Sequence, residues 1–135
     1  MTPGPIIYVD TSALGALLVE QPESDALEQW LDQTTALQVS SDLLEIELRR
    51  LAVREGLEQA DVTLLLDGVG LAALDRAVYR SAGLLPMPYL RTLDALHLEA
   101  AMRLDAAAIL TYDRRLGEAA RPVGLQVIAP GVESG

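Results

Sequence analysis

Short apolar runs alternate with stretches of helical periodicity along the whole chain. Apolar runs occupy residues 6–9, 36–40, 107–110 and 125–128, each four or five residues long. Runs this short are typical of strands buried inside a parallel sheet. Residues 71–74 form one more such run; Ala is a poor strand former, but the place of this run in the alternation indicates a fifth strand.

Between these runs, apolar residues recur at spacings of three and four, which predicts helices. The predicted helices cover residues 12–20, a segment opening at 23 or 24, 42–55, 58–67, 75–83, 92–104 and 113–120. Ser41 or Asp42 can cap the helix over 42–55, and Gly56 is placed to end it. Regular alternation of strand and helix favours an α/β fold, with a parallel sheet covered by helices on both faces.

The length of 135 residues suits one domain spanning 1–135, with residues 1–4 and 130–135 expected to be frayed ends. No apolar run approaches the roughly 18–20 residues of a membrane span, and no basic region precedes the short N-terminal apolar stretch. We therefore expect a soluble protein without a membrane partner.

The residue types that are missing exclude several classes of chemistry. The chain has no Cys, no Lys and one His, and all ten of its basic residues are Arg. Thiolate nucleophiles, cysteine-based metal centres, Schiff bases and the P-loop lysine are therefore excluded. The formal net charge of −10 opposes unaided binding to a phosphate backbone and suits divalent cations or a basic protein partner.

Two aspartates lie just after two of the predicted strands. Asp10 comes after the run at 6–9, and Asp113 lies three residues after the run at 107–110. Each could simply cap the next helix. However, open α/β sheets place their sites at the carboxyl ends of strands, so the two acids together also indicate a functional cleft.

Two more acids lie on predicted helices. Asp94 is in the first turn of a largely apolar helix, where a carboxylate should face a polar cleft or a cation. His97 lies on a similar face, and we interpret it as a packing or orienting group that could position Asp94. Glu47 shares one side of its helix with Arg50 and Arg54.

Four carboxylates in one cleft would repel each other unless a cation neutralised them. A ligand set of carboxylate oxygens suits Mg²⁺ or Mn²⁺ better than zinc or copper. Mg²⁺ retains several of its waters, so such a site leaves room for a substrate phosphate and a nucleophilic water. This layout is that of metal-assisted phosphodiester hydrolysis.

Four segments, YVDTSAL, SSDLLEIEL, LRTLDALHLEAA and ILTYDRRLGEAA, together resemble the PIN-domain ribonucleases, and more specifically the VapC-type toxins of toxin–antitoxin pairs. The resemblance covers essentially the whole chain. It implies a three-layer fold with a parallel sheet of order 3-2-1-4-5 and a cytoplasmic homodimer. It also implies a cognate antitoxin whose basic residues enter the acidic cleft.

The functional residues of the family match positions of this sequence one by one: Asp10, Ser12, Glu47, Asp94, Thr111 and Asp113. By resemblance, the four acids are catalytic, bind one or two Mg²⁺ or Mn²⁺ ions and activate water to cut RNA, with Ser12 and Thr111 in support. Glu47 rather than Glu45 fits the family pattern; we interpret Asp42 and Glu45 as solvated charges. Glu99 stands where the family has a small residue, and we expect it at the surface.

Five arginines are candidates for contacts with RNA phosphates and are otherwise ordinary solvated charges: Arg50, Arg54, Arg91, Arg114 and Arg115. The type of RNA stays open, because its recognition depends on loops and shape.

Two alternative functions require different features of the sequence. A phosphatase of the haloacid-dehalogenase type requires Asp-x-Asp and a Lys, whereas this chain has Asp10-Thr11-Ser12 and no Lys. A non-catalytic interaction module would use apolar helix faces such as those carrying Leu17 and Trp30.

Overall fold

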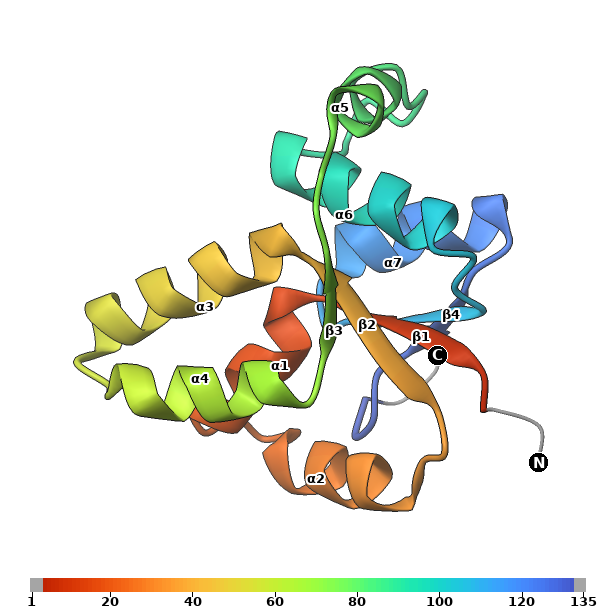
Figure 1. Ribbon diagram of the computed structural model, residues 1–135. Coiled ribbons are helices and arrows are strands. Elements are labelled where there is room, and N and C mark those ends of the chain that lie inside the picture. The colour runs from red at the N-terminus through yellow and green to blue at the C-terminus, as the bar shows by residue number, and fades with distance from the viewer. Residues whose placement is uncertain (1–3, 133–135) are drawn as a thin grey trace.

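A five-stranded, all-parallel sheet forms the centre of the computed structural model, which describes residues 4–132 (Figure 1). The strands are β1 (Ile6–Val9), β2 (Leu37–Ser41), β3 (Gly70–Ala72), β4 (Ala108–Leu110) and β5 (Gln126–Ile128). Their order is β3-β2-β1-β4-β5, which confirms the order implied by the family resemblance.

The helices follow the predicted alternation. They are α1 (Thr11–Leu18), α2 (Ser24–Gln33), α3 (Asp42–Glu55), α4 (Gln59–Asp67), α5 (Arg76–Gly83), α6 (Thr92–Arg103) and α7 (Arg114–Ala120), followed by a 3₁₀ turn, η1 (Arg121–Val123). Predicted and observed boundaries differ by no more than two residues. Gly56 ends α3 in a left-handed conformation, as expected for a helix C-cap.

Alternate residues of the central strands face opposite layers of helices. Ile7 and Val9 of β1 pack with Leu110 of β4 against α1, α2, α3 and α4. Tyr8 and Ile109 point the other way, into a second core with α6 and α7. This division produces the three layers visible in Figure 1, where α5 lies over α6 on the outer side.

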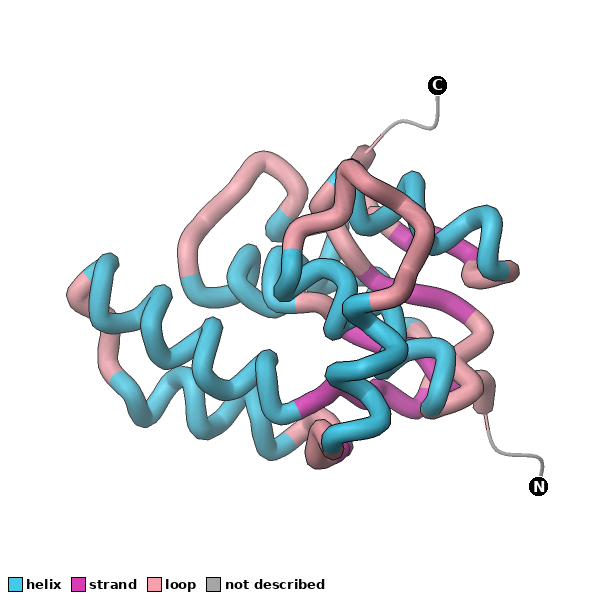
Figure 2. The backbone as a smooth tube through the Cα atoms, turned by 90° about the horizontal axis from the view of Figure 1, so that it is seen from above, coloured by secondary structure: helices cyan, strands magenta, loops and turns pink. Residues whose placement is uncertain are grey.

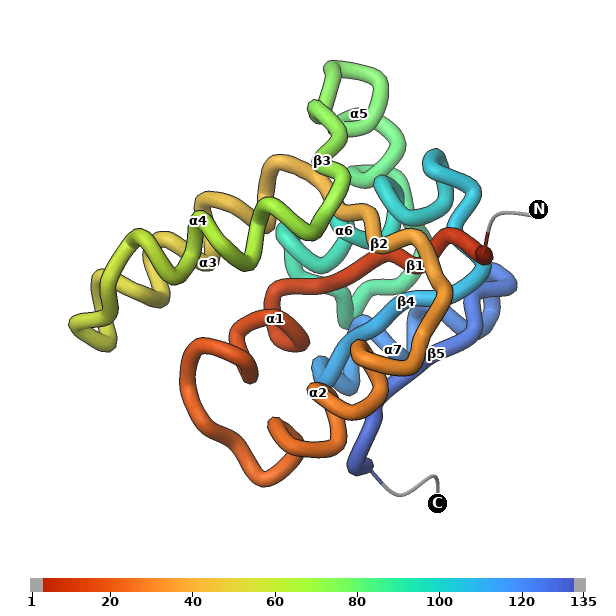
Figure 3. Tube along the Cα trace, turned by 60° about the horizontal axis from the view of Figure 1, so that its bottom comes forward, coloured from red at the N-terminus to blue at the C-terminus, as the bar shows by residue number. Residues whose placement is uncertain are grey.

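The sheet order reverses direction beside β1, and this reversal positions the candidate site. The connection from β1 leads through two helices to β2 on one side, whereas β4 pairs with β1 on the other side. Figure 3 shows β1 and β4 running next to each other toward α1. The carboxyl ends of these two strands therefore mark the switch point at which ligands of α/β sheets bind.

α3 and α4 form a pair of helices that extends away from the sheet, at the left of Figures 1 and 2. The apolar faces of α1 and α2 are directed inward instead. Leu17 and Trp30 are partly buried against the core, so these faces serve packing.

The expectation that Glu99 lies at the surface is wrong. Glu99 is only 8% exposed, and its carboxylate accepts a hydrogen bond of 3.1 Å from Arg103 Nε. Arg103 in turn donates to the Ala77 carbonyl and to Ser81 Oγ of α5. Glu99 is buried because α5 packs across α6, a contact that the sequence pattern does not reveal.

No helix within residues 4–132 is long and apolar enough to cross a membrane. Of the ends expected to fray, residues 1–3 and 133–135 lie outside the described residues. The Pro130 carbonyl accepts a hydrogen bond of 2.7 Å from the Tyr112 hydroxyl.

Candidate active site

Asp10 stands at the carboxyl end of β1, and two hydroxyl groups fix its carboxylate. It is 6% exposed, and its backbone N–H donates to the Leu110 carbonyl of β4. Oδ2 accepts hydrogen bonds from Ser12 Oγ at 2.6 Å and from Thr111 Oγ1 at 2.8 Å. It also accepts from the Ser12 backbone N–H, so Asp10 is the cap of α1 as well as a member of the site. Ser12 and Thr111 therefore lie where a supporting role would require them.

Asp113 has the same arrangement at the neighbouring strand. Its Oδ1 caps α7 by accepting from the backbone N–H groups of Arg115 and Leu116, at 2.9 and 3.2 Å. Its own N–H donates to Thr111 Oγ1 at 3.0 Å, and that same hydroxyl donates to Asp10. Thr111 thus connects the ends of β1 and β4.

Asp94 lies half-buried in the first turn of α6 and faces a polar cavity of about 670 Å³. The cavity is lined by Glu47, Arg91, Thr92, Leu93, Asp94, Asp113, Arg114 and Arg115. Burial, followed by the negative charges of Asp113 and Asp10, raises the pKa of Asp94 above its usual value. Asp113 and Asp10 therefore both act electrostatically on Asp94, although the three aspartates come from separate elements.

Glu47 reaches this cleft from α3. Its Oε1 accepts a hydrogen bond of 2.8 Å from Thr11 Oγ1 and lies 2.6 Å from His97 Nε2. Burial favours a raised pKa for Glu47, but the hydrogen bond from His97, the charge of His97 and the hydrogen bond from Thr11 outweigh burial and lower it. Glu47 is thus held as a carboxylate.

His97 contacts Glu47, whereas the sequence suggested that it could position Asp94. The ring is 1% exposed, and its Nε2 is also 3.6 Å from Asp10 Oδ1. Burial alone would lower the pKa of His97, but its hydrogen bond to Glu47 and the charges of Asp10, Glu47 and Asp94 raise it. The helical face was predicted correctly, whereas the partner comes from a different helix, α3.

Sequence reasoning missed two other residues that contact the site. The Thr11 hydroxyl donates a hydrogen bond to Glu47, and the Tyr8 hydroxyl lies 2.7 Å from His97 Nδ1. For Thr11, the only local signal in the sequence was its position beside Asp10. Tyr8 reads in the sequence as one more apolar residue of a strand.

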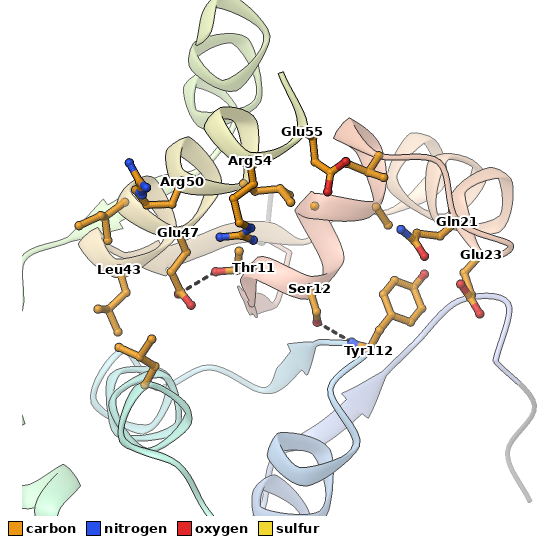
Figure 4. Close-up of a pocket in the computed structure, with 16 residues that line it drawn as sticks. Thr11, Ser12, Gln21, Glu23, Leu43, Glu47, Arg50, Arg54, Glu55 and Tyr112 are labelled. Carbon is orange, nitrogen blue, oxygen red and sulfur yellow. Dashed lines mark hydrogen bonds between the residues drawn. The ribbon is translucent and has the colours of Figure 1, made fainter. Parts of the chain in front are cut away.

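The five candidate arginines fall into two groups. Arg91, Arg114 and Arg115 line the polar cavity around Asp94. Arg50 and Arg54 line a larger, mostly apolar cavity of about 850 Å³ between α1 and α3, which Figure 4 shows together with Tyr112 on its far wall. Glu47 and Leu93 line both cavities, so the acidic centre lies between two groups of cationic side chains.

The carboxylate oxygens of these residues suit a hard divalent cation, although in this conformation the described side chains are not gathered into a metal site. Among residues 4–132, no three Asp, Glu or His side chains are gathered closely enough to hold a metal ion. Asp10, Glu47 and Asp113 each direct one oxygen to a protein donor, while the other accepts no hydrogen bond from the described residues. These second oxygens and the Asp94 carboxylate are oxygen ligands of the kind that Mg²⁺ and Mn²⁺ prefer.

Comparison with known proteins identifies related chains over most of this length. The PIN domain family matches residues 7–122. Ribonuclease VapC35 of Mycobacterium tuberculosis is 42% identical over 135 residues, covering 93% of this chain and 98% of its own. Ribonuclease VapC46 of the same organism is 43% identical over 129 residues, covering 92% and 97%.

Solved structures share the fold at lower identity. The Mycobacterium tuberculosis toxin VapC20, described as cleaving the sarcin–ricin loop, superposes with a TM-score of 0.72 at 16% identity, covering 84% of this chain and 94% of its own. A chain of a toxin–antitoxin complex from Klebsiella pneumoniae gives a TM-score of 0.67 at 21% identity, covering 92% and 97%. At these identities the likeness supports the fold alone.

Proposed function

The chain belongs to the PIN-domain family, among the VapC-type ribonucleases, and from this premise we propose that it is a metal-dependent endoribonuclease and the toxin of a toxin–antitoxin pair. The relatives that share 42–43% identity are named ribonucleases. In this proposal a single PIN domain spans residues 1–135 and acts on RNA in the cytoplasm.

One observation carries the proposal. Glu47, Asp94 and Asp113 line a common cavity at the carboxyl ends of β1 and β4, and the charge of Asp10 acts on Asp94 there. Such a concentration of negative charge opposes RNA binding unless a cation is present. A divalent cation would therefore serve both the site and its substrate.

Asp10, Glu47, Asp94 and Asp113 would hold one or two Mg²⁺ or Mn²⁺ ions. When bound, such a cation neutralises charge on the phosphate and makes water a stronger acid, which favours hydrolysis. Ser12 and Thr111 keep Asp10 in a single orientation, since both donate to its Oδ2. Preorganisation of this kind avoids rearranging the carboxylate during the reaction.

The arginines would bind the RNA backbone on both sides of the acidic centre. Arg91, Arg114 and Arg115 can contact phosphates at the polar cavity, and Arg50 and Arg54 can do so along the larger one. These five guanidinium groups supply local positive charge in a chain whose net charge is −10.

We further propose a homodimer and a cognate antitoxin as partners. The VapC family membership and the Klebsiella pneumoniae toxin–antitoxin complex among the structural neighbours support the antitoxin. An antitoxin with basic side chains would complement the acidic cleft.

The proposal is tested with end-labelled RNA and purified protein. We expect cleavage with Mg²⁺ or Mn²⁺, none after chelation by EDTA, and recovery when the metal is restored. Asp10→Asn and Asp94→Asn should lower the rate by about two orders of magnitude or more, because each removes a ligand charge. Asp61→Asn, an exposed acid of α4, is the matched control and should cleave normally.

Full cleavage by Asp10→Asn, or cleavage that resists EDTA, would contradict the proposal. Antitoxin binding without any cleavage would instead support an interaction module. Sequencing the 5′ ends produced during brief expression, with Asp10→Asn alongside, would identify the RNA.

A further inference from the structure

Both ring nitrogens of His97 are engaged although the ring is almost fully enclosed. Nδ1 lies 2.7 Å from the Tyr8 hydroxyl, and Nε2 lies 2.6 Å from Glu47 Oε1. The Tyr8 ring also meets the imidazole edge-on, with centroids 5.6 Å apart and planes inclined by 70°. Any rotation of the His97 ring would break at least one of these contacts.

The Tyr8 end of this chain of contacts is anchored in the sheet. Tyr8 belongs to β1, is 0% exposed, and its hydroxyl donates to Ser41 Oγ at the end of β2 at 2.9 Å. The position of the imidazole is therefore set by the two central strands, and not by α6 alone.

The other end of the chain of contacts holds a single oxygen of Glu47. Thr11 Oγ1 and His97 Nε2 both contact Oε1, from α1 and α6 respectively. A glutamate has three rotatable side-chain bonds, and two contacts from different elements select one orientation. Oε2 accepts no hydrogen bond from residues 4–132 and is left to the cleft.

His97 lies close to Asp10 as well as to Glu47. Its Nε2 lies 3.6 Å from Asp10 Oδ1 while it contacts Glu47. The ring therefore stands between two carboxylates that are supplied by different elements, one after β1 and one on α3.

We propose that His97 is a positioning residue for metal binding: it clamps Glu47 Oε1 against Thr11 and so presents the second oxygen of Glu47 beside Asp10. This inference rests on the proposed function, since it assumes that Glu47 binds the cation. His97 acts through Glu47 and does not itself contact the metal.

An ordinary stabilising role for a buried histidine predicts a different outcome. In both cases His97→Leu destabilises the fold, because it removes one of the two hydrogen-bond partners of the Tyr8 hydroxyl and one of the two partners of Glu47 Oε1. Only a positioning role also lowers the metal affinity of the protein that remains folded. Outer residues that orient metal ligands typically change affinity by about 10–100-fold when they are replaced.

The experiment titrates metal-free protein with Mn²⁺ and measures free Mn²⁺ by electron paramagnetic resonance, with folding checked by circular dichroism. We expect His97→Leu to bind Mn²⁺ about 10–100-fold more weakly than the wild type. His97→Gln should stay within about threefold, because its amide N–H can still donate to Glu47. Glu99→Gln, a buried acid on the same helix and outside the cleft, is the control and should bind normally.

A double-mutant cycle separates action through Glu47 from an independent effect. In a Glu47→Gln background, His97→Leu should weaken Mn²⁺ binding by less than about twofold further, because its target carboxylate is gone. If His97→Leu fails to fold, Tyr8→Phe replaces it in the cycle. That variant keeps the ring of residue 8 and removes the hydroxyl that fixes Nδ1, and we expect a loss of about 3–10-fold.

Wild-type affinity in a folded but less stable His97→Leu protein would overturn the proposal. Equal losses with and without the Glu47 carboxylate would overturn it as well. A wild-type protein that binds no Mn²⁺ would refute the proposed metal-dependent function itself, and this inference with it.

Discussion

Single carboxylates in this site perform a local and a long-range task at the same time. One oxygen of Asp10 caps α1, and one oxygen of Asp113 caps α7. The second oxygen of each accepts no hydrogen bond from the described residues, and that of Asp10 lies 3.6 Å from His97 Nε2. Capping is a local stabilising interaction, and here it also orients a charged group at the end of a strand. For Asp94, a backbone hydrogen bond from Arg91 and the charge of His97 favour the ionised form, but burial and the charges of Asp113 and Asp10 outweigh them and raise its pKa.

We predict that Asp94→Asn stabilises the metal-free protein. The pKa of Asp94 is raised in the folded state, so its favourable contribution is present at acid pH and is lost as the pH rises through this pKa. At pH 7 the ionised group destabilises the fold, and its neutral replacement should raise the free energy of unfolding by a few tenths to about 1 kcal/mol. Urea denaturation in EDTA measures this change. The stability gained by Asp94→Asn should shrink as the pH falls toward 4. If the variant were less stable than the wild type at pH 7, the predicted repulsion between Asp94 and the other aspartates would be refuted.

Tyr8 gives a prediction at alkaline pH. Burial is the main cause that raises the pKa of Tyr8 from its usual value near 10 to about 12. The folded state therefore keeps this proton longer than the unfolded chain, and the stability that depends on it is lost as the pH rises from about 10 to 12. Over that window the wild type should lose up to about 3 kcal/mol more than Tyr8→Phe. If the free energies of unfolding of the two proteins changed equally over this pH range, Tyr8 would ionise as an exposed tyrosine does.

At the scale of elements, α3 is the helix that supplies most of the charged groups of the larger cavity. It begins directly after β2, at Asp42, so its orientation is tied to the sheet. Glu47, Arg50 and Arg54 lie along one side of it and all line the larger cavity (Figure 4). With Glu55, which also lines this cavity, α3 thus delivers two acidic and two basic groups to the same region as a rigid unit.

The end of α3 depends on a residue that can adopt a left-handed conformation. Gly56 has φ of +68°, and a β-carbon added at this position would meet nothing within 4 Å. Gly56→Ala should therefore destabilise the protein by about 1 kcal/mol through backbone strain alone. Gly83, the last residue of α5, has the same open surroundings without a positive φ. Gly83→Ala should stabilise by about 0.4–1 kcal/mol, and urea denaturation of both variants should give opposite signs.

At the scale of the whole molecule, the sheet order and the net charge determine what the site can bind. The order β3-β2-β1-β4-β5 sets the ends of β1 and β4 next to each other, so the acids that follow them, Asp10 and Asp113, lie close enough for both charges to act on Asp94. The net charge of −10 repels RNA at long range, so the substrate must be held by few, local contacts. Arginines at the cavities are the groups able to make them.

This charge distribution predicts how RNA binding responds to salt. In Asp10→Asn protein, which should not cut the RNA, affinity should fall as salt rises, and Arg114→Ala or Arg115→Ala should each reduce the slope of log K against log salt by about 0.7–1. Arg121→Ala, in η1 beyond the far end of α7, should leave the slope unchanged. Binding measured by fluorescence anisotropy at several salt concentrations tests this. Equal slopes in all three variants would show that Arg114 and Arg115 do not contact phosphate.

The sequence by itself determined the elements and their order along the chain, and it singled out three aspartates as candidates, because these depend on local signals. Apolar periodicity defined α3 at residues 42–55, Gly56 marked its end, and a strand followed by an acid marked Asp10. The family resemblance supplied the sheet order and singled out Glu47 from its neighbours. Periodicity alone left Glu47 undecided.

Only the tertiary structure decided which side chains meet. Glu99 is buried because α5 crosses α6, and His97 contacts Glu47 at a separation of 50 residues and Tyr8 at 89. No local pattern encodes such partners, because they depend on how helices on opposite sides of a strand are packed. The physical reason is that periodicity specifies which face of an element is buried, whereas the group that covers this face is specified by the packing of the whole chain.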